Sequence, residues 1–509
     1  MNCHFLPRNQ APNHIPQRAF GRFDHAEFSD DGTRALVAFD LVDAQWIEDQ
    51  SMENEMFSLN DQKVQQRAWR RFIQETTHQI HNRNPFDDMP IYRLEITLLT
   101  DEPWFGLPQL PPAYIGAGLS DALADMEQPW IEFSLAQAAI NNDPDMTGSL
   151  YQWMFEESIA VTVQGNLLHG PTARSLSTTF SLRHLPTISH LDLEALLASA
   201  QADWLVVFDV GQGNACALLQ EDSNDPDAGS PMLYFDLGVG VYRNKDTTPA
   251  NLQFGFYGNP PVVLSHWDSD HWSGAFVANA NNAYPALQLQ WIAPLQTVGP
   301  SHVAFAHQVR RAGGQFLIYD QAGGSVGVAP LQDGRCIRFM RGTGRSRNDS
   351  GLVMTIENND QGVKRSWILT GDCDYGYFMP VLVPAAPLGL VAPHHGASLS
   401  PNTPVPIPDL TFPYRRLIYS FGQKNKHGRT NVQHPTVNGV SAHSVKDWSH
   451  NGWNPQDPGS PLAAGDVRST CAHTPAVPRG GVLVGWREPQ NLIQVKSGWN
   501  SVVPSTEQI

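Results

Sequence analysis

Histidine and aspartate are concentrated in one short stretch of the chain, residues 262–274, which reads VVLSHWDSDHWSG. Its first residues predict a buried strand, and His266, Asp268, Asp270 and His271 follow directly. Side chains two positions apart on an extended chain point the same way, so His266 and Asp268 can bind one ion while Asp270 and His271 are directed towards another. Imidazole nitrogens mixed with carboxylate oxygens suit Zn, Mn or Fe(II) better than Ca or Mg. The alternative, a surface loop that merely contains these residues, is disfavoured because titratable groups seldom follow an apolar run without a partner.

Other aspartates and histidines that could bind ligands follow the ends of other apolar runs. Asp209 in DVGQGNA, Asp236 in YFDLGVG and Asp372 in WILTGDCD each follow a strand-like segment, and His394 and His395 end another in LVAPHHGAS. The neighbouring glycines permit close backbone approach, so these side chains are well placed to bind or orient ligands. For Asp209 and Asp236, capping of a turn is an equal alternative.

Basic residues are clustered although the chain is acidic overall. Residues 310–347 contain seven arginines against Asp320 and Asp333, and residues 415–429 contain five basic side chains and no acid. Such clusters attract phosphate, although a solvated loop that balances an acidic surface has the same composition. The candidate phosphate-binding residues are Arg345, Arg347, Lys424, Lys426 and Arg429.

Taken together and in this order, the motifs resemble those of the metallo-β-lactamase superfamily, most closely the nuclease-like domain of ComEC-type DNA-uptake proteins. The resemblance covers about residues 203–440. It implies an αββα sandwich that binds two divalent ions, Zn or Mn, in which Asp372 bridges the ions and Asp270 and His271 belong to the second one. His266 and Asp268 would then hold the first ion.

The resemblance also suggests roles for the remaining candidates. One of His394 and His395 would be a ligand of the second ion and the other a proton donor, and the sequence leaves open which. The segment SFGQKNKHGRTNVQHP resembles the closing segment of that branch and places His434 near the site, with an expected role in turnover rather than in metal binding. Asp209, Asp236 and Asp349 are expected to support the ligands by hydrogen bonding.

Two departures from the family pattern bear on the first ion. Many relatives supply a third histidine before the bridging aspartate, but this region reads RSRNDSGLV and offers only Asn348, Asp349 and Ser350. Asn214 stands where the branch usually has an acid. We therefore expect the first ion to bind weakly.

Length and composition predict a globular protein of more than one domain. The chain has 509 residues, of which 41% are hydrophobic and 16% charged, and its net charge of -17 argues against a surface coated in basic residues for non-specific DNA binding. Five scattered cysteines without CxxC spacing indicate reduced thiols. No signal peptide or apolar span is recognisable, so a cytoplasmic protein without membrane contact is expected.

Periodicity divides the chain near residue 200. An α+β domain is predicted for residues 1–200, with strands at 33–41 and 92–98, a helix from Asp61 to Ile80, helical patches at 121–127 and 134–141, and strand-like segments SIAVTV (158–163) and SLSTTFSL (175–182). A helix at 191–202 leads into a second domain at 201–509, where short apolar strands alternate with helices such as 302–312 and predict the α/β class. The resemblance implies that this domain is a hydrolase with the metallo-β-lactamase fold.

The leading hypothesis is a metallo-hydrolase that cleaves a phosphodiester, with nucleic acid as the favoured substrate. The alternatives are a phosphorylcholine-type esterase or lactone hydrolase, and a scaffold protein with a degenerate metal site that docks a protein partner through residues 1–200.

Overall fold

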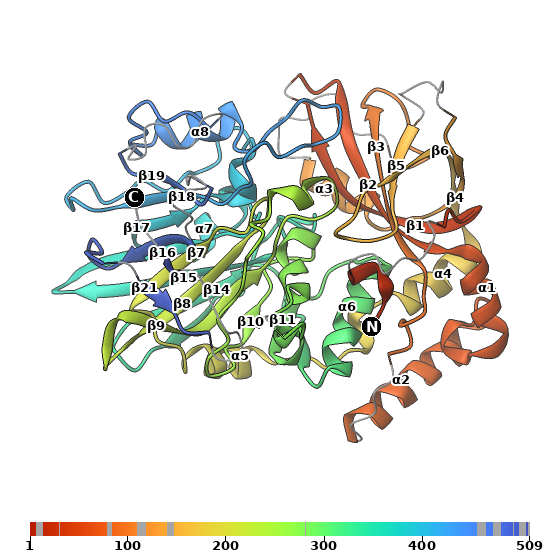
Figure 1. Ribbon diagram of the computed structural model, residues 1–509, viewed down its shortest axis with the longest axis horizontal. Helices are drawn as coiled ribbons and strands as arrows, with labels where there is room; N and C mark the ends of the chain where they lie inside the picture. Colours follow the sequence, from red (N-terminus) through yellow and green to blue (C-terminus); the bar gives the residue numbers. More distant parts are fainter. Residues whose placement is uncertain are drawn as a thin grey trace. The chain divides into compact units, whose positions relative to one another are not determined.

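The computed structural model describes residues 1–6, 14–29, 31–78, 84–108, 119–139, 147–279, 281–455, 465–471, 480–491, 493–497 and 505–506. The chain forms two compact units (Figure 1). The first contains Met1–Pro186 together with Leu295–Phe316 and Lys426–Val432, and the second contains Thr187–Pro294, Leu317–Asn425 and Gln433–Ile509.

The first unit is built on six antiparallel strands that close into a barrel in the order β1-β2-β3-β5-β6-β4. Inward-facing apolar residues of these strands, such as Phe39, Leu94 and Phe133, form its core. The strands are β1 (Arg18–Phe28), β2 (Arg34–Asp43), β3 (Ile91–Leu99), β4 (Trp130–Gln137), β5 (Thr147–Tyr151) and β6 (Ile159–Leu168). The helices are α1 (Ala44–Glu53), α2 (Gln62–His78), α3 (Leu119–Met126), α4 (Gly170–Thr179) and α6 (Pro300–Arg311).

Most elements expected in the first 200 residues are confirmed, and two are wrong. Residues 134–137 extend strand β4, which pairs with β1 and β6, because the alternation of buried Ile131, Phe133 and Leu135 with more exposed residues continues through them. Residues 140–141 lie outside the described residues. Residues 175–179 belong to helix α4, which begins at Gly170 with a proline in its first turn and buries Ser175, Leu176 and Thr179 at helical spacing.

The second unit is mixed α/β and contains two sheets. One has the strand order β12-β11-β10-β9-β8-β7-β20, extended by β21 and β22, and the other has the order β13-β14-β15-β16-β17-β18-β19. The first sheet consists of β7 (Trp204–Phe208), β8 (Ala215–Asp222), β9 (Asp225–Leu237), β10 (Val262–Val263), β11 (Gln290–Pro294), β12 (Gln315–Tyr319), β20 (Gly481–Gly485), β21 (Ile493–Val495) and β22 (Ser505–Thr506). The second consists of β13 (Gly327–Pro330), β14 (Cys336–Arg341), β15 (Leu352–Asp360), β16 (Val363–Leu369), β17 (Ala386–Val391), β18 (Arg416–Tyr419) and β19 (Val467–Ser469).

Residues from both sheets of the second unit share one hydrophobic cluster. Val207 and Phe235 from one sheet belong to it together with Phe339 and Trp367 from the other. The unit also contains helices α5 (His190–Leu197), α7 (Met379–Leu382) and α8 (Val437–Ser444). The short apolar strands expected beyond residue 200 are present, and their apolar side chains are largely buried.

The division between the units differs from a single boundary near residue 200. Helix α5 packs Leu193 and Leu197 into the core of the second unit, so the division falls before it, at Pro186. Two later segments, Leu295–Phe316 with helix α6 and Lys426–Val432, belong to the first unit. Local periodicity gives no signal for such returns of the chain, because they depend on contacts between distant segments.

Among the helices of the described residues, none combines the length and apolar character that a membrane span requires.

Candidate metal centre

The candidate residues of the second unit follow the ends of four strands. Strand β10 pairs in parallel with β9, and β16 pairs in parallel with β17. Asp236 lies at the end of β9 and His266 follows β10, whereas Asp372 follows β16 and His394 follows β17. Parallel strands bring their carboxyl ends to one edge of a sheet, so each sheet carries part of the candidate site at such an edge.

Asp236 organises the loop after β10. This carboxylate is fully buried and accepts hydrogen bonds from Ser265 N (2.6 Å), Ser265 Oγ (2.8 Å) and Asn214 Nδ2 (2.9 Å). It also accepts from His271 Nδ1 at 2.8 Å. Ser265 has given its only hydroxyl hydrogen to Asp236, so its oxygen accepts from His266 Nδ1 at 3.0 Å. Both imidazoles are therefore held with Nδ1 as the donor and with Nε2 directed elsewhere.

The Nε2 atoms of these histidines face Asp372. His271 Nε2 lies 3.1 Å from Asp372 Oδ1, and His266 Nε2 lies 3.6 Å from Asp372 Oδ2. His266 Nε2, His271 Nε2 and Asp372 Oδ1 are buried and make no hydrogen bond of acceptable geometry. Ligand atoms of His266, His271 and Asp372 lie within 4.8 Å of one another. Three buried polar atoms thus converge without satisfying one another.

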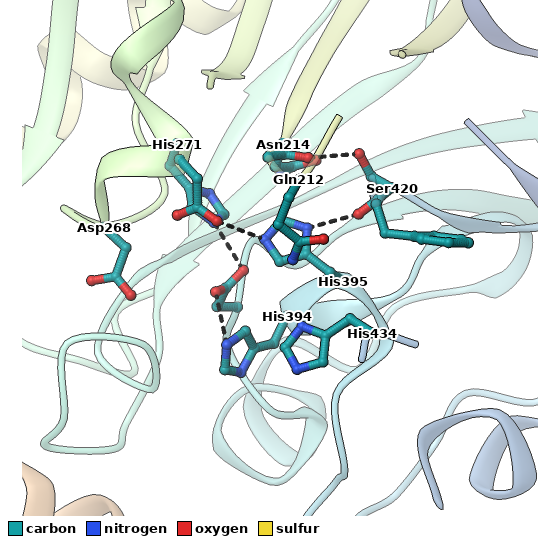
Figure 2. A network of polar contacts seen from close by, with 12 residues as sticks. Gln212, Asn214, Asp268, His271, His394, His395, Ser420 and His434 are labelled. Carbon is teal, nitrogen blue, oxygen red and sulfur yellow. Dashed lines mark hydrogen bonds and ion pairs between the residues drawn. The ribbon is translucent and has the colours of Figure 1, made fainter. Parts of the chain in front are cut away.

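His395 is oriented in the same way from the second sheet. Its Nδ1 donates to the backbone carbonyl of Ser420 at 2.7 Å, while its Nε2 lies 3.2 Å from Asp270 Oδ2 and also makes no hydrogen bond of acceptable geometry. Asp270, His271 and His395 form a second cluster of ligand atoms within 4.8 Å. The centres of the His271 and His395 rings lie 5.6 Å apart, and Figure 2 labels both residues beside this cluster.

His394 and His434 lie beside this cluster. His394 Nε2 is 3.7 Å from Asp372 Oδ2, and its side chain is 22% exposed, whereas that of His395 is 3% exposed. The ring of His434 lies 5.2 Å from that of His394, and Figure 2 shows the two rings side by side. Asn425 holds the backbone of His434 through bonds to its N–H and its carbonyl. The two adjacent histidines of the HHG segment are therefore distinct, one buried and one half-open.

Backbone conformation at the site is unusual. His394 and His395 both adopt left-handed conformations, with φ of 48° and 54°, which side chains other than glycine adopt at some cost. At Gly238 an added Cβ would lie 1.6 Å from the carbonyl oxygen of Asp270, so only glycine fits there. The close approach expected from the glycines of YFDLGVG is confirmed, and it holds the Asp270 loop in place.

Burial and neighbouring charges shift the pKa values of Asp270, His271 and Asp372. Burial opposes ionisation of Asp372, but His271, His394 and His266 outweigh burial and hold its pKa well below the usual range. Burial likewise opposes protonation of His271, but Asp372 and Asp236 raise its pKa well above the usual value. Burial also acts against the Asp270 carboxylate, yet the nearby His395 and His271 lower its pKa to about 2. The pocket therefore favours ionised carboxylates and attracts positive charge.

Arg347 has a contact that differs from its expected phosphate-binding role. Its side chain is 1% exposed, and its Nη1 donates to Asp268 Oδ1 at 3.1 Å. The other oxygen of Asp268 lies 3.5 Å from His266 Nε2. A guanidinium so placed is directed at a carboxylate of the candidate site and is closed to solvent.

The remaining candidates fall into two groups. Asp209 accepts from Gly211 N across its own turn at 3.4 Å. Asp349 accepts from Ser346 Oγ and from Asp374 N, and the second bond joins its loop to the one that carries Asp372.

The candidate phosphate-binding residues other than Arg347 differ in their unit. Arg345 and Lys424 are exposed side chains of the second unit, whereas Lys426 and Arg429 belong to the first unit. The proposed phosphate-binding set is thus divided between the two units.

Two contributors have no motif of their own. Ser265 bridges Asp236 and His266, and the carbonyl of Ser420 fixes His395. Serine at a strand end is common, so only its position directly before His266 could have indicated the first. The second acts through its backbone, which leaves no mark on the sequence.

The donor set fits a transition-metal ion. Imidazole Nε2 atoms whose Nδ1 atoms donate to a carboxylate, a hydroxyl or a carbonyl are prepared to bind Zn or Mn, and the carboxylates of Asp270 and Asp372 supply oxygen ligands. The buried atoms that lack hydrogen bonds in this cluster are the atoms that such an ion would contact.

No protein-family model matches the chain, and no curated protein sequence matches it significantly.

Proposed function

We propose that the second unit is a divalent-metal-dependent hydrolase of phosphodiesters, folded as a metallo-β-lactamase-type αββα sandwich. One observation carries the proposal: the Nε2 atoms of His266, His271 and His395 are all presented to carboxylates in a buried space, each fixed by a hydrogen bond at Nδ1. Two of these imidazoles, those of His271 and His395, are arranged to bind the same metal ion, and that of His266 faces Asp372 beside it.

In this proposal Asp270, His271, His395 and Asp372 hold an ion of Zn or Mn. When bound, such an ion supplies Lewis acidity that polarises a phosphoryl oxygen and lowers the pKa of a water molecule. Asp236 and Ser420 keep His271 and His395 in the tautomer that presents Nε2. If the centre holds a second ion, as the resemblance implies, His266 and Asp268 would be its ligands.

His394 is the proton donor in this proposal. It is the more exposed histidine of the HHG segment, and its Nε2 lies near Asp372 without belonging to the Asp270 cluster. A half-open imidazole can deliver a proton to the leaving oxygen and recover one from water. His434, whose ring lies beside His394, helps to orient it. Lys424 and Arg345, both exposed, are candidates for neutralising the phosphate.

The test uses the full chain, stripped with a chelator and reloaded with Zn²⁺ or Mn²⁺. Single-stranded DNA, cyclic nucleotides, a choline phosphoester and a lactone are compared as substrates, and bound metal is measured by elemental analysis. His395→Ala is expected to lose metal and hydrolysis together, whereas His394→Ala keeps the metal and loses turnover. A wild-type protein that binds no transition metal would contradict the proposal and favour the scaffold alternative.

A further inference from the structure

We infer that Arg347 replaces one of the two metal ions, so that the centre holds a single ion around His271 and a fixed guanidinium beside Asp268. The inference rests on the proposed metal centre and concerns how many ions it binds.

His271 belongs to both groups of candidate metal ligands in the second unit. Both ligand clusters, His266 with His271 and Asp372, and Asp270 with His271 and His395, depend on this residue. Its Nδ1 donates to Asp236, which leaves Nε2 as its one coordinating atom. An imidazole nitrogen has one lone pair and binds one ion. The two clusters are therefore overlapping descriptions of one position, and His271 cannot complete both at once.

Few ligands would remain for another ion. These are His266 and Asp268, with Asp372 shared between the positions, because His266 Nε2 lies 3.5 Å from Asp268 Oδ2 and 3.6 Å from Asp372 Oδ2. Among the described residues, Asp268 belongs to none of the ligand clusters within 4.8 Å. In Figure 2 Asp268 lies to one side of the histidines. The position beside His266 is therefore poor in ligands.

Asp268 is already paired with a cation of the protein. The guanidinium of Arg347 lies 3.1 Å from Asp268 Oδ1, and both side chains are at least nine-tenths buried. A dication at Asp268 would either repel this guanidinium at close range or displace it from its carboxylate where water does not reach it. Breaking a buried ion pair is strongly unfavourable. Arg347 thus supplies the positive charge that the carboxylate needs and excludes a second ion.

Hydrogen bonds within its own loop hold the backbone around Arg347 in place. Ser346 Oγ donates to Asp349 Oδ2 at 3.0 Å, and Asp349 Oδ1 accepts from Asp374 N at 3.2 Å. The residues on both sides of Arg347 are thereby joined to the loop that carries Asp372. The guanidinium is part of the same framework as the metal ligands and does not need a substrate to bring it there.

The experiment counts ions. The chelator-stripped full chain is titrated with Mn²⁺ and Zn²⁺, bound metal is measured by elemental analysis, and the Mn²⁺ protein is examined by electron paramagnetic resonance. We expect about one equivalent and the spectrum of an isolated Mn²⁺ ion, because the charge of Arg347 occupies the second position. Arg347→His, which removes the fixed charge and adds a neutral nitrogen ligand, is expected to bind about two equivalents and to show exchange-coupled Mn²⁺.

Two controls separate the outcomes. Arg365→Met removes a comparable arginine, whose Nε lies 3.0 Å from Asp409 Oδ2 outside the site, and is expected to leave the count at about one. Asp268→Asn is also expected to retain the ion, because Asp268 is not its ligand. Two equivalents in the wild type, or loss of the ion in Asp268→Asn, would overturn the single-ion centre while leaving a metal-dependent hydrolase intact. Absence of any bound ion would overturn both proposals, and the wild-type count decides even if Arg347→His does not fold.

Discussion

Buried histidines and carboxylates meet in both units of the molecule, but they are balanced in different ways. In the first unit Asp24 pairs with Arg93, which also donates to Glu95, and Asp40 accepts from Ser301 N and Oγ at the start of helix α6. His302 accepts from Gly299 N through Nδ1 and faces Asp24 through Nε2. Each carboxylate in this network has a protein donor.

In the cluster of the second unit, several buried polar atoms have no such hydrogen-bond partner. Asp372 Oδ1 and the Nε2 atoms of His266, His271 and His395 are buried without a hydrogen bond of acceptable geometry. Burial of polar groups is costly unless they are paired, so an arrangement that leaves several of them convergent favours an external partner. The two networks differ in their carboxylates, because Asp372 Oδ1 lacks a hydrogen bond whereas Asp24 and Asp40 have protein donors.

The largest expected effect comes from Asp372→Asn. The amide keeps the shape but loses the charge that His271 and His266 face, so we expect loss of bound metal and a fall in hydrolysis of about 100-fold or more, with the fold retained. Elemental analysis, turnover and denaturant unfolding measure the three effects. Asp40→Asn is the matched control in the first unit and should change stability alone. Equal metal loss in both variants would remove the distinction between the two networks.

Arg93→Met tests the first-unit network, where we expect a loss of stability and no change in metal binding. The change leaves Asp24 and Glu95 buried without their shared cation, and such a loss typically costs about 3 kcal/mol of unfolding free energy. Metal content per folded molecule should be unchanged. Chemical denaturation measures the cost. A variant as stable as the wild type would mean that this network does not depend on its ion pairs.

How much of this could be predicted differs between the two networks and within the site. Strand β3 and the candidate metal ligands of the loop at His266 could be predicted from the sequence, because the alternation of apolar residues and the residue types are local properties. Arg347 lies 79 residues after Asp268 in the sequence. Arg347 is in the loop before β15 and Asp268 is in the loop after β10, so no local sequence pattern contains their pairing. His394 and His395 have the same residue type and adjacent positions, and only their backbone conformations and burial distinguish them.

Asp236→Asn sharpens the comparison within the second unit. Asp236 is not a proposed ligand, but its carboxylate accepts from His271 Nδ1 and from Ser265. An amide in its place can present a donor to His271 and favour the wrong tautomer. Metal affinity is expected to fall by roughly 10- to 100-fold, as for other residues that orient ligands. Isothermal titration with Zn²⁺ checks this, and unaltered affinity would show that His271 does not need Asp236 to present Nε2.

The smallest effect concerns a buried histidine of the second unit that faces no carboxylate cluster. His443 lies between Tyr375 OH (2.8 Å from Nε2) and the carbonyl of Gly439 (2.7 Å from Nδ1), and burial lowers its pKa to about 4. Its pKa is lower in the folded than in the unfolded chain, so the unfolded chain takes up the proton first. The stability that neutral His443 contributes is then present above about pH 6.5 and is lost as the pH falls towards 4.

Between about pH 7 and about pH 5 this loss amounts to about 2 kcal/mol, because each pKa unit corresponds to about 1.4 kcal/mol. His443→Gln retains donor and acceptor atoms but does not titrate, so it is expected to be less stable than the wild type near neutral pH and to lose less stability on acidification. Urea unfolding of the two metal-free proteins at both pH values measures the difference. Equal pH dependence would mean that His443 remains neutral in the unfolded chain or accepts its proton without cost in the folded one, and acid sensitivity would then belong to other buried histidines such as His184, whose pKa burial lowers to about 3.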